Sequence, residues 1–76
     1  MPRPNPKLVK AAARVAEAKR IVAGQRLVVE TLKAQGRPAD EAEALLETLA
    51  SALLVLEGHE RKLREARRAK TRETKK

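Results

Sequence analysis

The fold of this chain is decided by the stretch Gln35-Gly36-Arg37-Pro38-Ala39-Asp40, which separates two long helical patterns. Glycine adopts the left-handed conformation that closes a helix, so Gly36 is expected just past the end of the first helix. Proline cannot continue a helix and disfavours helical geometry at the preceding residue, which stops the first helix before Arg37. Asp40 is a suitable N-cap for the second helix, with Glu43 three residues further on as in a capping box. The stretch therefore predicts a helical hairpin.

The first helix is predicted to span residues 6–35. Asn5 is a suitable N-cap and Pro6 suits the first helical position, while the proline-rich residues 1–5 are expected to form an extended leader. Two lines of residues at heptad spacing face one side, namely Leu8, Val15, Val22 and Val29 on one line and Ala11, Ala18 and Leu32 on the other. Gln25 interrupts the second line. Ile21 and Val28 flank the stripe, which is therefore wider than one partner helix would cover.

The second helix is predicted to span residues 40–69, after a turn over 36–39. Its expected stripe is Leu45, Leu49, Ala52, Leu56, Leu63 and Ala66, with Leu46 and Leu53 alongside. A short turn makes the two helices antiparallel neighbours. This arrangement is expected to place Gln25 beside Ser51 and His59 near Val15 and Ala16. Residues 70–76 lack an apolar stripe and are predicted to form a flexible basic tail.

The composition favours association with another molecule. The chain has 76 residues, of which 42% are hydrophobic, and it has no Phe, Tyr, Trp or Cys. A core of small and aliphatic side chains without disulfides makes such a short chain marginal by itself. The expected fold class is thus all-α, an antiparallel, coiled-coil-like two-helix hairpin that completes a four-helix bundle by dimerisation or by docking on a larger protein. The expected interaction face consists of Val15, Ile21, Val22, Val28, Val29, Leu32, Leu45, Leu49, Leu53, Leu56 and Leu63.

The charges are strongly segregated along the chain. The formal net charge is +8, with +7 in residues 1–37, −6 in residues 40–60 and +7 in residues 61–76. Folding at the turn gathers both basic blocks at one end, which favours attraction of polyanions. An alternative function is therefore a small basic nucleic-acid-associated protein that binds the phosphate backbone through its termini. The residues expected to contact phosphate are Arg61, Lys62, Arg64, Arg67, Arg68, Lys70 and Arg72. A solvated tail is the other interpretation of the same residues, because no aromatic side chain is present for base stacking.

No residue pattern predicts a catalytic, cofactor or metal site. Ser51 and His59 are eight residues apart on one helix, roughly 12 Å along its axis, which is beyond hydrogen-bond reach. The Glu-x-x-His motif of metal-binding bundles is not met, because Leu56 stands three residues before His59. No apolar run approaches the roughly 18 residues of a membrane span, and the amino terminus lacks the apolar segment of a signal peptide. We expect a non-enzymatic, cytoplasmic protein with protein partners and no membrane or small-molecule ligand.

A set of residues spread over both predicted helices forms a second pattern. It consists of Val15-Ala16-Glu17, Ala23, Gln25-Arg26, Val29, Leu32 and Gly36, followed by Glu41-Ala42, Leu45-Leu46, Leu56, His59, Arg61 and Leu63. In these positions the chain resembles a group of short, uncharacterised bacterial helical-hairpin proteins. The resemblance implies the hairpin fold and carries no activity.

Overall fold

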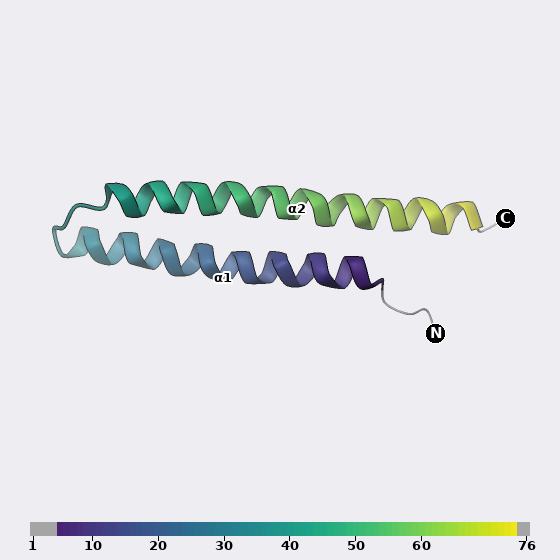
Figure 1. Cartoon of the computed structure of the whole chain (residues 1–76), viewed down its shortest axis with the longest axis horizontal. Coiled ribbons are helices and arrows are strands. Elements are labelled where there is room, and N and C mark those ends of the chain that lie inside the picture. The colour runs from purple at the N-terminus through teal and green to yellow at the C-terminus, as the bar shows by residue number, and fades with distance from the viewer. Residues whose placement is uncertain (1–4, 75–76) are drawn as a thin grey trace.

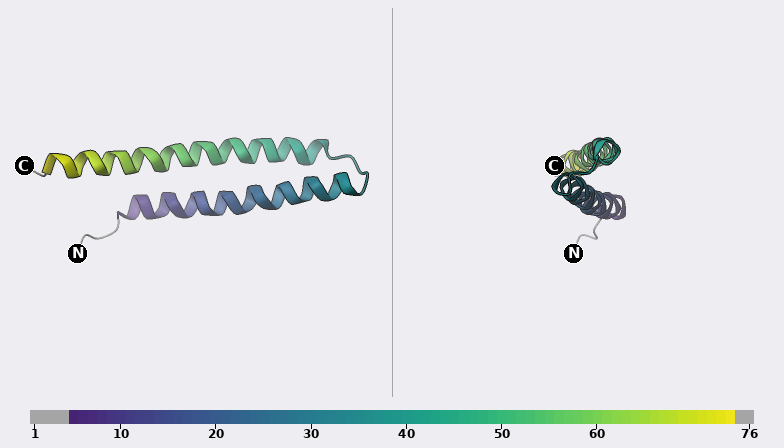
Figure 2. Two further views of the ribbon diagram at one scale, coloured as in Figure 1. Left: turned by 180° about the vertical axis from the view of Figure 1, so that it is seen from behind. Right: turned by 90° about the vertical axis from the view of Figure 1, so that its left-hand side faces the viewer.

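The computed structural model describes residues 5–74, with side chains for residues 5–69, and it consists of two antiparallel helices (Figure 1). Helix α1 spans Pro6–Ala34 and helix α2 spans Asp40–Thr74. The two helices run side by side along a rod with extents of 63 × 20 × 13 Å (Figure 2). The predicted all-α helical hairpin is confirmed.

The start of α1 follows the capping prediction. The Asn5 side-chain oxygen Oδ1 accepts a hydrogen bond from the backbone N–H of Lys7 at 3.0 Å, and Pro6 is the first helical residue. The backbone of Asn5 is extended, with φ −67° and ψ 116°. Asn5 thus satisfies one of the backbone donors that a helix start leaves unpaired. The rest of the predicted leader, residues 1–4, lies outside the described residues.

The turn closes α1 through a glycine in the left-handed conformation. Gly36 has φ 68°, and its N–H donates to the carbonyl of Lys33 at 3.0 Å. The N–H of Arg37 donates to the carbonyl of Leu32 at 2.9 Å. These two bonds form a Schellman motif, which satisfies carbonyls at the end of the helix. Helix α1 therefore ends at Ala34, one residue before the predicted end.

The start of α2 differs from the predicted cap by one residue. The carbonyl of Ala39 accepts the first helical bond from the N–H of Glu43 at 2.8 Å, and Asp40 is already helical. Ala39, the residue before α2, is buried at 7% exposure. Asp40 consequently contributes through its charge at the positive end of the helix dipole, together with Glu41 and Glu43 in the same first turn.

Two glycines with opposite conformational demands provide a stability test of this turn. Replacing Gly36 by alanine is expected to destabilise the fold by about 1 kcal/mol, because an L-residue is strained at positive φ. Replacing Gly58 by alanine is expected to stabilise α2 by about 0.5–1 kcal/mol, because a Cβ there would meet no atom within 4 Å. Urea unfolding followed by circular dichroism, at one protein concentration, measures both changes. A shift of the same sign for both variants would contradict the assigned turn.

The core is a single seam between the helices. Its buried residues are Ala11, Val15, Val22, Val29 and Ala39, each 5–7% exposed. Leu8, Ala18, Gln25 and Leu32 are partly buried beside them. Both heptad lines predicted for α1 therefore face α2. No described side chain is fully buried, so the seam is thin.

The predicted stripe of α2 is confirmed at Leu49, Leu56 and Leu63 and was wrong at its other three positions. The partly buried residues that follow the seam are Ala42, Leu46, Leu49, Leu53, Leu56, Glu60 and Leu63, at alternating spacings of four and three residues. Leu45, Ala52 and Ala66, which were expected in the stripe, are exposed. The observed phase places two large side chains, Leu46 and Leu53, in the seam where the predicted phase would have placed Leu45 and the smaller Ala52. It also brings Glu60 to the seam, where its carboxylate accepts from Arg64 at 3.4 Å.

Gln25 makes a different contact from the one expected. Its Nε2 donates to the backbone carbonyl of Ala42 at 2.9 Å, and Ser51 is exposed. The predicted Gln25–Ser51 pair is therefore wrong. The observed bond links the middle of α1 to the first turn of α2 and satisfies the only polar side chain on the α1 heptad lines. Such a group favours one register of the two helices over others.

Helix α2 continues through Thr74, five residues beyond the predicted boundary at residue 69. Ala, Arg and Lys are good helix formers, and basic residues are favourable at the negative end of the helix dipole. The predicted tail 70–76 is thus helical as far as Thr74. Residues 75–76 lie outside the described part of the chain.

Candidate functional site

Several large apolar side chains remain exposed on the hairpin. Ile21 and Val28 on α1 are each 46% exposed, and Leu45 and Val55 on α2 are 49% and 72% exposed. Val9, Leu27 and Leu54 are exposed as well. The hairpin therefore leaves uncovered many of the side chains that would contribute most to a core.

Ile21 and Val28 belong to a row of residues on α1, and Leu45 and Val55 belong to a row on α2. Both rows border one side of the seam. The row on α1, at spacings of three and four residues, is Lys7, Lys10, Arg14, Glu17, Ile21, Gly24, Val28 and Thr31. The row on α2, at the same spacings, is Glu41, Leu45, Thr48, Ala52, Val55, His59 and Lys62. One groove is lined from both rows, by Lys7, Lys10 and Arg14 of the first and His59 of the second, together with the seam residues Ala11 and Leu63. The two rows therefore lie on the same side of the hairpin, and we call this side the open flank.

The other side of the seam is charged. Lys33 and Glu43, each directly following a seam residue, form an ion pair with Nζ and Oε1 2.9 Å apart. The groove on this side is lined by Val29, Lys33, Glu43, Leu46, Glu47 and Ala50. Because both partners of the ion pair are about half exposed, the pair contributes at most about 1 kcal/mol. We call this side the charged flank.

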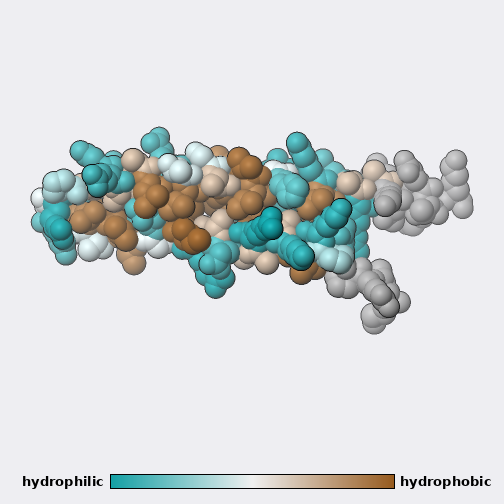
Figure 3. Space-filling model, in the orientation of Figure 1, coloured by the Kyte–Doolittle hydropathy of each residue, from teal (hydrophilic) through white to brown (hydrophobic). Residues whose placement is uncertain are grey.

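Apolar side chains gather along the line between the two helices in the space-filling view (Figure 3). The apolar and small residues of the open flank are Ile21, Gly24, Val28, Leu45, Ala52 and Val55. The other exposed large apolar residues of the described part, Val9, Leu27 and Leu54, lie outside both rows. The open flank is thus the side of the hairpin on which exposed apolar residues of both helices meet.

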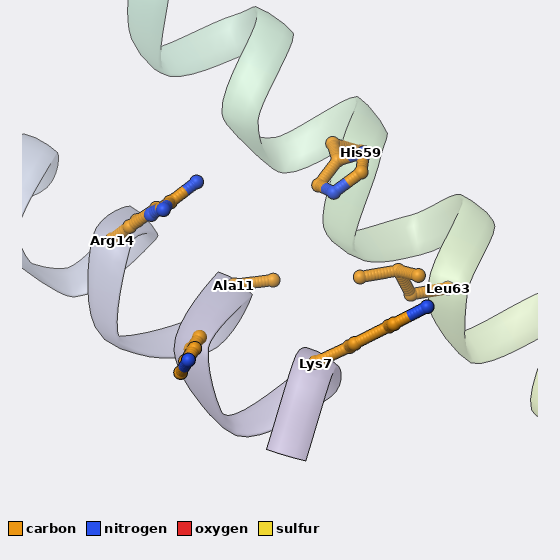
Figure 4. Close-up of a pocket in the computed structure, with 6 residues that line it drawn as sticks. Lys7, Ala11, Arg14, His59 and Leu63 are labelled. Carbon is orange, nitrogen blue, oxygen red and sulfur yellow. The ribbon is translucent and has the colours of Figure 1, made fainter. Parts of the chain in front are cut away.

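The end of the open flank farthest from the turn is positively charged. The side chains of Lys7 and Arg14 extend from α1 toward α2, where His59 and Leu63 face them (Figure 4). No ion pair among the described residues involves Lys7, Lys10 or Arg14. Their charges are therefore not compensated within the hairpin.

The hairpin exposes much more surface than a compact protein of its size. Its solvent-accessible surface is 6604 Å², whereas compact monomers of 8.4 kDa expose about 4,600 Å². Its radius of gyration is 17.9 Å, against about 11 Å for a compact domain of this length. The excess surface exceeds the roughly 800 Å² that each partner buries in a stable protein–protein interface.

The expected interaction face is divided by the structure. Val15, Val22 and Val29 are buried in the seam. Five leucines of the expected face are partly buried there, namely Leu32, Leu49, Leu53, Leu56 and Leu63. Only Ile21, Val28 and Leu45 of the expected face lie on the open flank. Ala52, Val55 and the cationic residues of this flank were not in the expected face. The sequence does contain a pattern that could have revealed them. On each helix a second row of residues precedes the seam row by one residue.

The residues expected to contact phosphate lie on the last turns of α2. Arg61, Lys62, Arg64, Arg67 and Arg68 are exposed, and Arg64 is paired with Glu60. The side chains of Lys70 and Arg72 fall outside the described part. The five described residues point to different sides of the helix, and only Lys62 belongs to the open flank.

No group of three or more His, Cys, Asp or Glu in the described part of the chain is arranged to hold a metal ion. Over the same residues, neither helix contains a stretch apolar enough to cross a membrane. No protein-family model, curated protein or solved structure matches the chain.

Proposed function

We propose that this chain is a protein–protein interaction module that oligomerises through its open flank, so that two hairpins complete a four-helix bundle. The activity is association, without chemistry on a substrate. The residues that carry it are Ile21, Val28, Leu45, Ala52 and Val55. In a bundle they would be covered by the equivalent surface of another hairpin, as the inward faces of bundle helices are.

The observation that supports this proposal most is that Ile21 and Val28 of α1 and Leu45 and Val55 of α2 are exposed on the same flank of the hairpin. Burying a fully exposed side chain of this size contributes roughly 1.5–3 kcal/mol, so covering one that is half exposed contributes about half of that. Among the residues that the structure describes with side chains, five are buried and none is fully buried. Exposed apolar patches on small proteins mark interaction surfaces. Association would therefore supply the burial that the thin seam lacks.

Two adjacent residues of α2 allow a direct test of the surface. Ala52 lies on the open flank, whereas Ser51 lies outside both rows, and both are exposed in the hairpin. Because the chain has no cysteine, Ala52→Cys and Ser51→Cys each create a single labelling site. We expect maleimide labelling of Cys at position 52 to slow as protein concentration rises, while labelling at position 51 stays constant.

The labelling test also separates the two forms of association. Equal rates at both positions over the whole concentration range would contradict oligomerisation through the open flank. Protection at position 52 that needs a different, added protein would assign the flank to a larger partner. Slowing at position 51 alone would place the contact on the other side of α2.

A further inference from the structure

The two halves of the hairpin carry opposite charge. Residues 21–54, next to the turn, contain three Lys/Arg and five Asp/Glu, for a net charge of −2. Residues 5–20 and 55–69, at the other end, contain ten Lys/Arg and four Glu, for a net charge of +6. Two hairpins placed side by side therefore attract one another when they run in opposite directions. When they run in the same direction, their basic ends repel.

The α2 row of the open flank shows the same change from negative to positive charge along its length. Its order is Glu41, Leu45, Thr48, Ala52, Val55, His59 and Lys62. The row begins with an acid, continues with apolar and small residues, and ends with basic or titratable residues. A reversed copy of the row pairs Leu45 with Val55 and Glu41 with His59, and places Lys62 about 4.5 Å further along the axis, next to the same Glu41. The α2 row is thus self-complementary when two copies run antiparallel, which is the requirement for a two-fold symmetric interface.

We propose that the partner of the open flank is a second copy of this chain, packed antiparallel so that the turn end of each hairpin lies beside the open end of the other. This inference rests on the proposed function and specifies its partner and orientation. The two-fold axis would cross α2 between Leu45 and Val55. Thr48 and Ala52 lie at this crossing, and Gly24 lies in the corresponding part of α1. Ala52 and Gly24 are small, which allows the helices of the two copies to approach closely there.

The cationic groove distinguishes this orientation from its alternative. In a parallel dimer, Lys62 of one copy would lie level with Lys7, Lys10 and Arg14 of the other, beside His59. None of these lysines or Arg14 has a compensating ion pair among the described residues. Parallel packing would therefore bring like charges together at one end. Antiparallel packing instead places the basic end of each hairpin beside the acidic first turn of α2 in the other copy.

A charge exchange between Glu41 and Lys62 tests the orientation. In the antiparallel dimer, Glu41→Lys lies within one helical turn of Lys62 of the second copy, and Lys62→Glu lies equally near its Glu41. We expect each variant alone to weaken the dimer roughly three- to tenfold at low salt, since each exposed contact is modest and occurs twice. An equimolar mixture of the two variants restores both opposite-charge contacts, so native mass spectrometry should show heterodimer above its statistical share.

The neighbouring Arg61 provides the matched control. Arg61→Glu makes the same change in net charge at the adjacent position, outside both rows of the open flank, and we expect it to leave the dimer dissociation constant unchanged. A tighter dimer in Lys62→Glu would overturn the proposal in favour of parallel packing. An equal effect of Lys62→Glu and Arg61→Glu would overturn it too. A wild-type chain that stays monomeric would instead contradict the proposed function, so the two failures are distinguishable.

Discussion

Replacing Val22 by aspartate is expected to unfold the hairpin. Val22 is the most buried side chain of the seam, at 5% exposure. An unpaired carboxylate in this position costs several kcal/mol, because the seam offers it no compensating partner. The core of such a short chain supplies only about 3–5 kcal/mol. Far-ultraviolet circular dichroism should therefore show the loss of most of the helical signal at 25 °C.

The matched control for this variant is Leu54→Asp. Leu54 lies on α2 and is 69% exposed, so the same polar replacement there should change the free energy of unfolding by no more than about 0.5 kcal/mol. A Val22→Asp chain that stays as helical and as cooperative as the wild type would show that the seam is misassigned. Unfolding of both variants to the same extent would show that Leu54 is also part of a core.

The second large effect is expected from the double variant Val28→Asp/Leu45→Asp, which should convert dimers into monomers. Both residues are on the open flank and about half exposed in the hairpin, at 46% and 49%. Because each side chain is only about half exposed, covering it contributes roughly 0.7–1.5 kcal/mol, and each substitution occurs in both copies. We therefore expect the dimer dissociation constant to rise more than about 100-fold, measured by sedimentation equilibrium.

The chain provides a control with the same chemistry on other surfaces. Leu27→Asp/Leu54→Asp replaces two apolar residues that are even more exposed, at 63% and 69%, but lie outside the rows of the open flank. This variant should keep the wild-type dissociation constant. Equal weakening by both double variants would indicate that general hydrophobicity, rather than one flank, drives association.

The architecture could be predicted from a few residues whose local chemistry leaves little choice. Gly36 closes α1 because it accepts positive φ, and Asn5 with Pro6 starts the same helix. The heptad lines of α1 were predictable because Val15, Val22 and Val29 are large, β-branched residues at constant spacing. The sequence was sufficient to predict a structural feature wherever one residue type adopts a backbone geometry or makes a capping bond that most other residues cannot.

The phase of α2 and the open flank could not be obtained in this way. Leucine occurs at both 45 and 46 and at both 53 and 54, so periodicity alone permits two stripes one residue apart. The choice between them depends on packing against α1, where Leu46 and Leu53 are partly buried. The cap at Ala39 could not be predicted either, because alanine has no side chain that caps a helix and its burial, at 7% exposure, is not visible in the local sequence.

Association through the open flank is tested most directly by the molar mass of the wild-type chain in solution. Sedimentation equilibrium at micromolar concentration and moderate salt should give twice the chain mass of 8.4 kDa. The Val28→Asp/Leu45→Asp variant under the same conditions should give the single-chain mass. A wild-type chain that is fully helical, cooperatively folded and of single-chain mass at every concentration would contradict the claim that the open flank is an association surface.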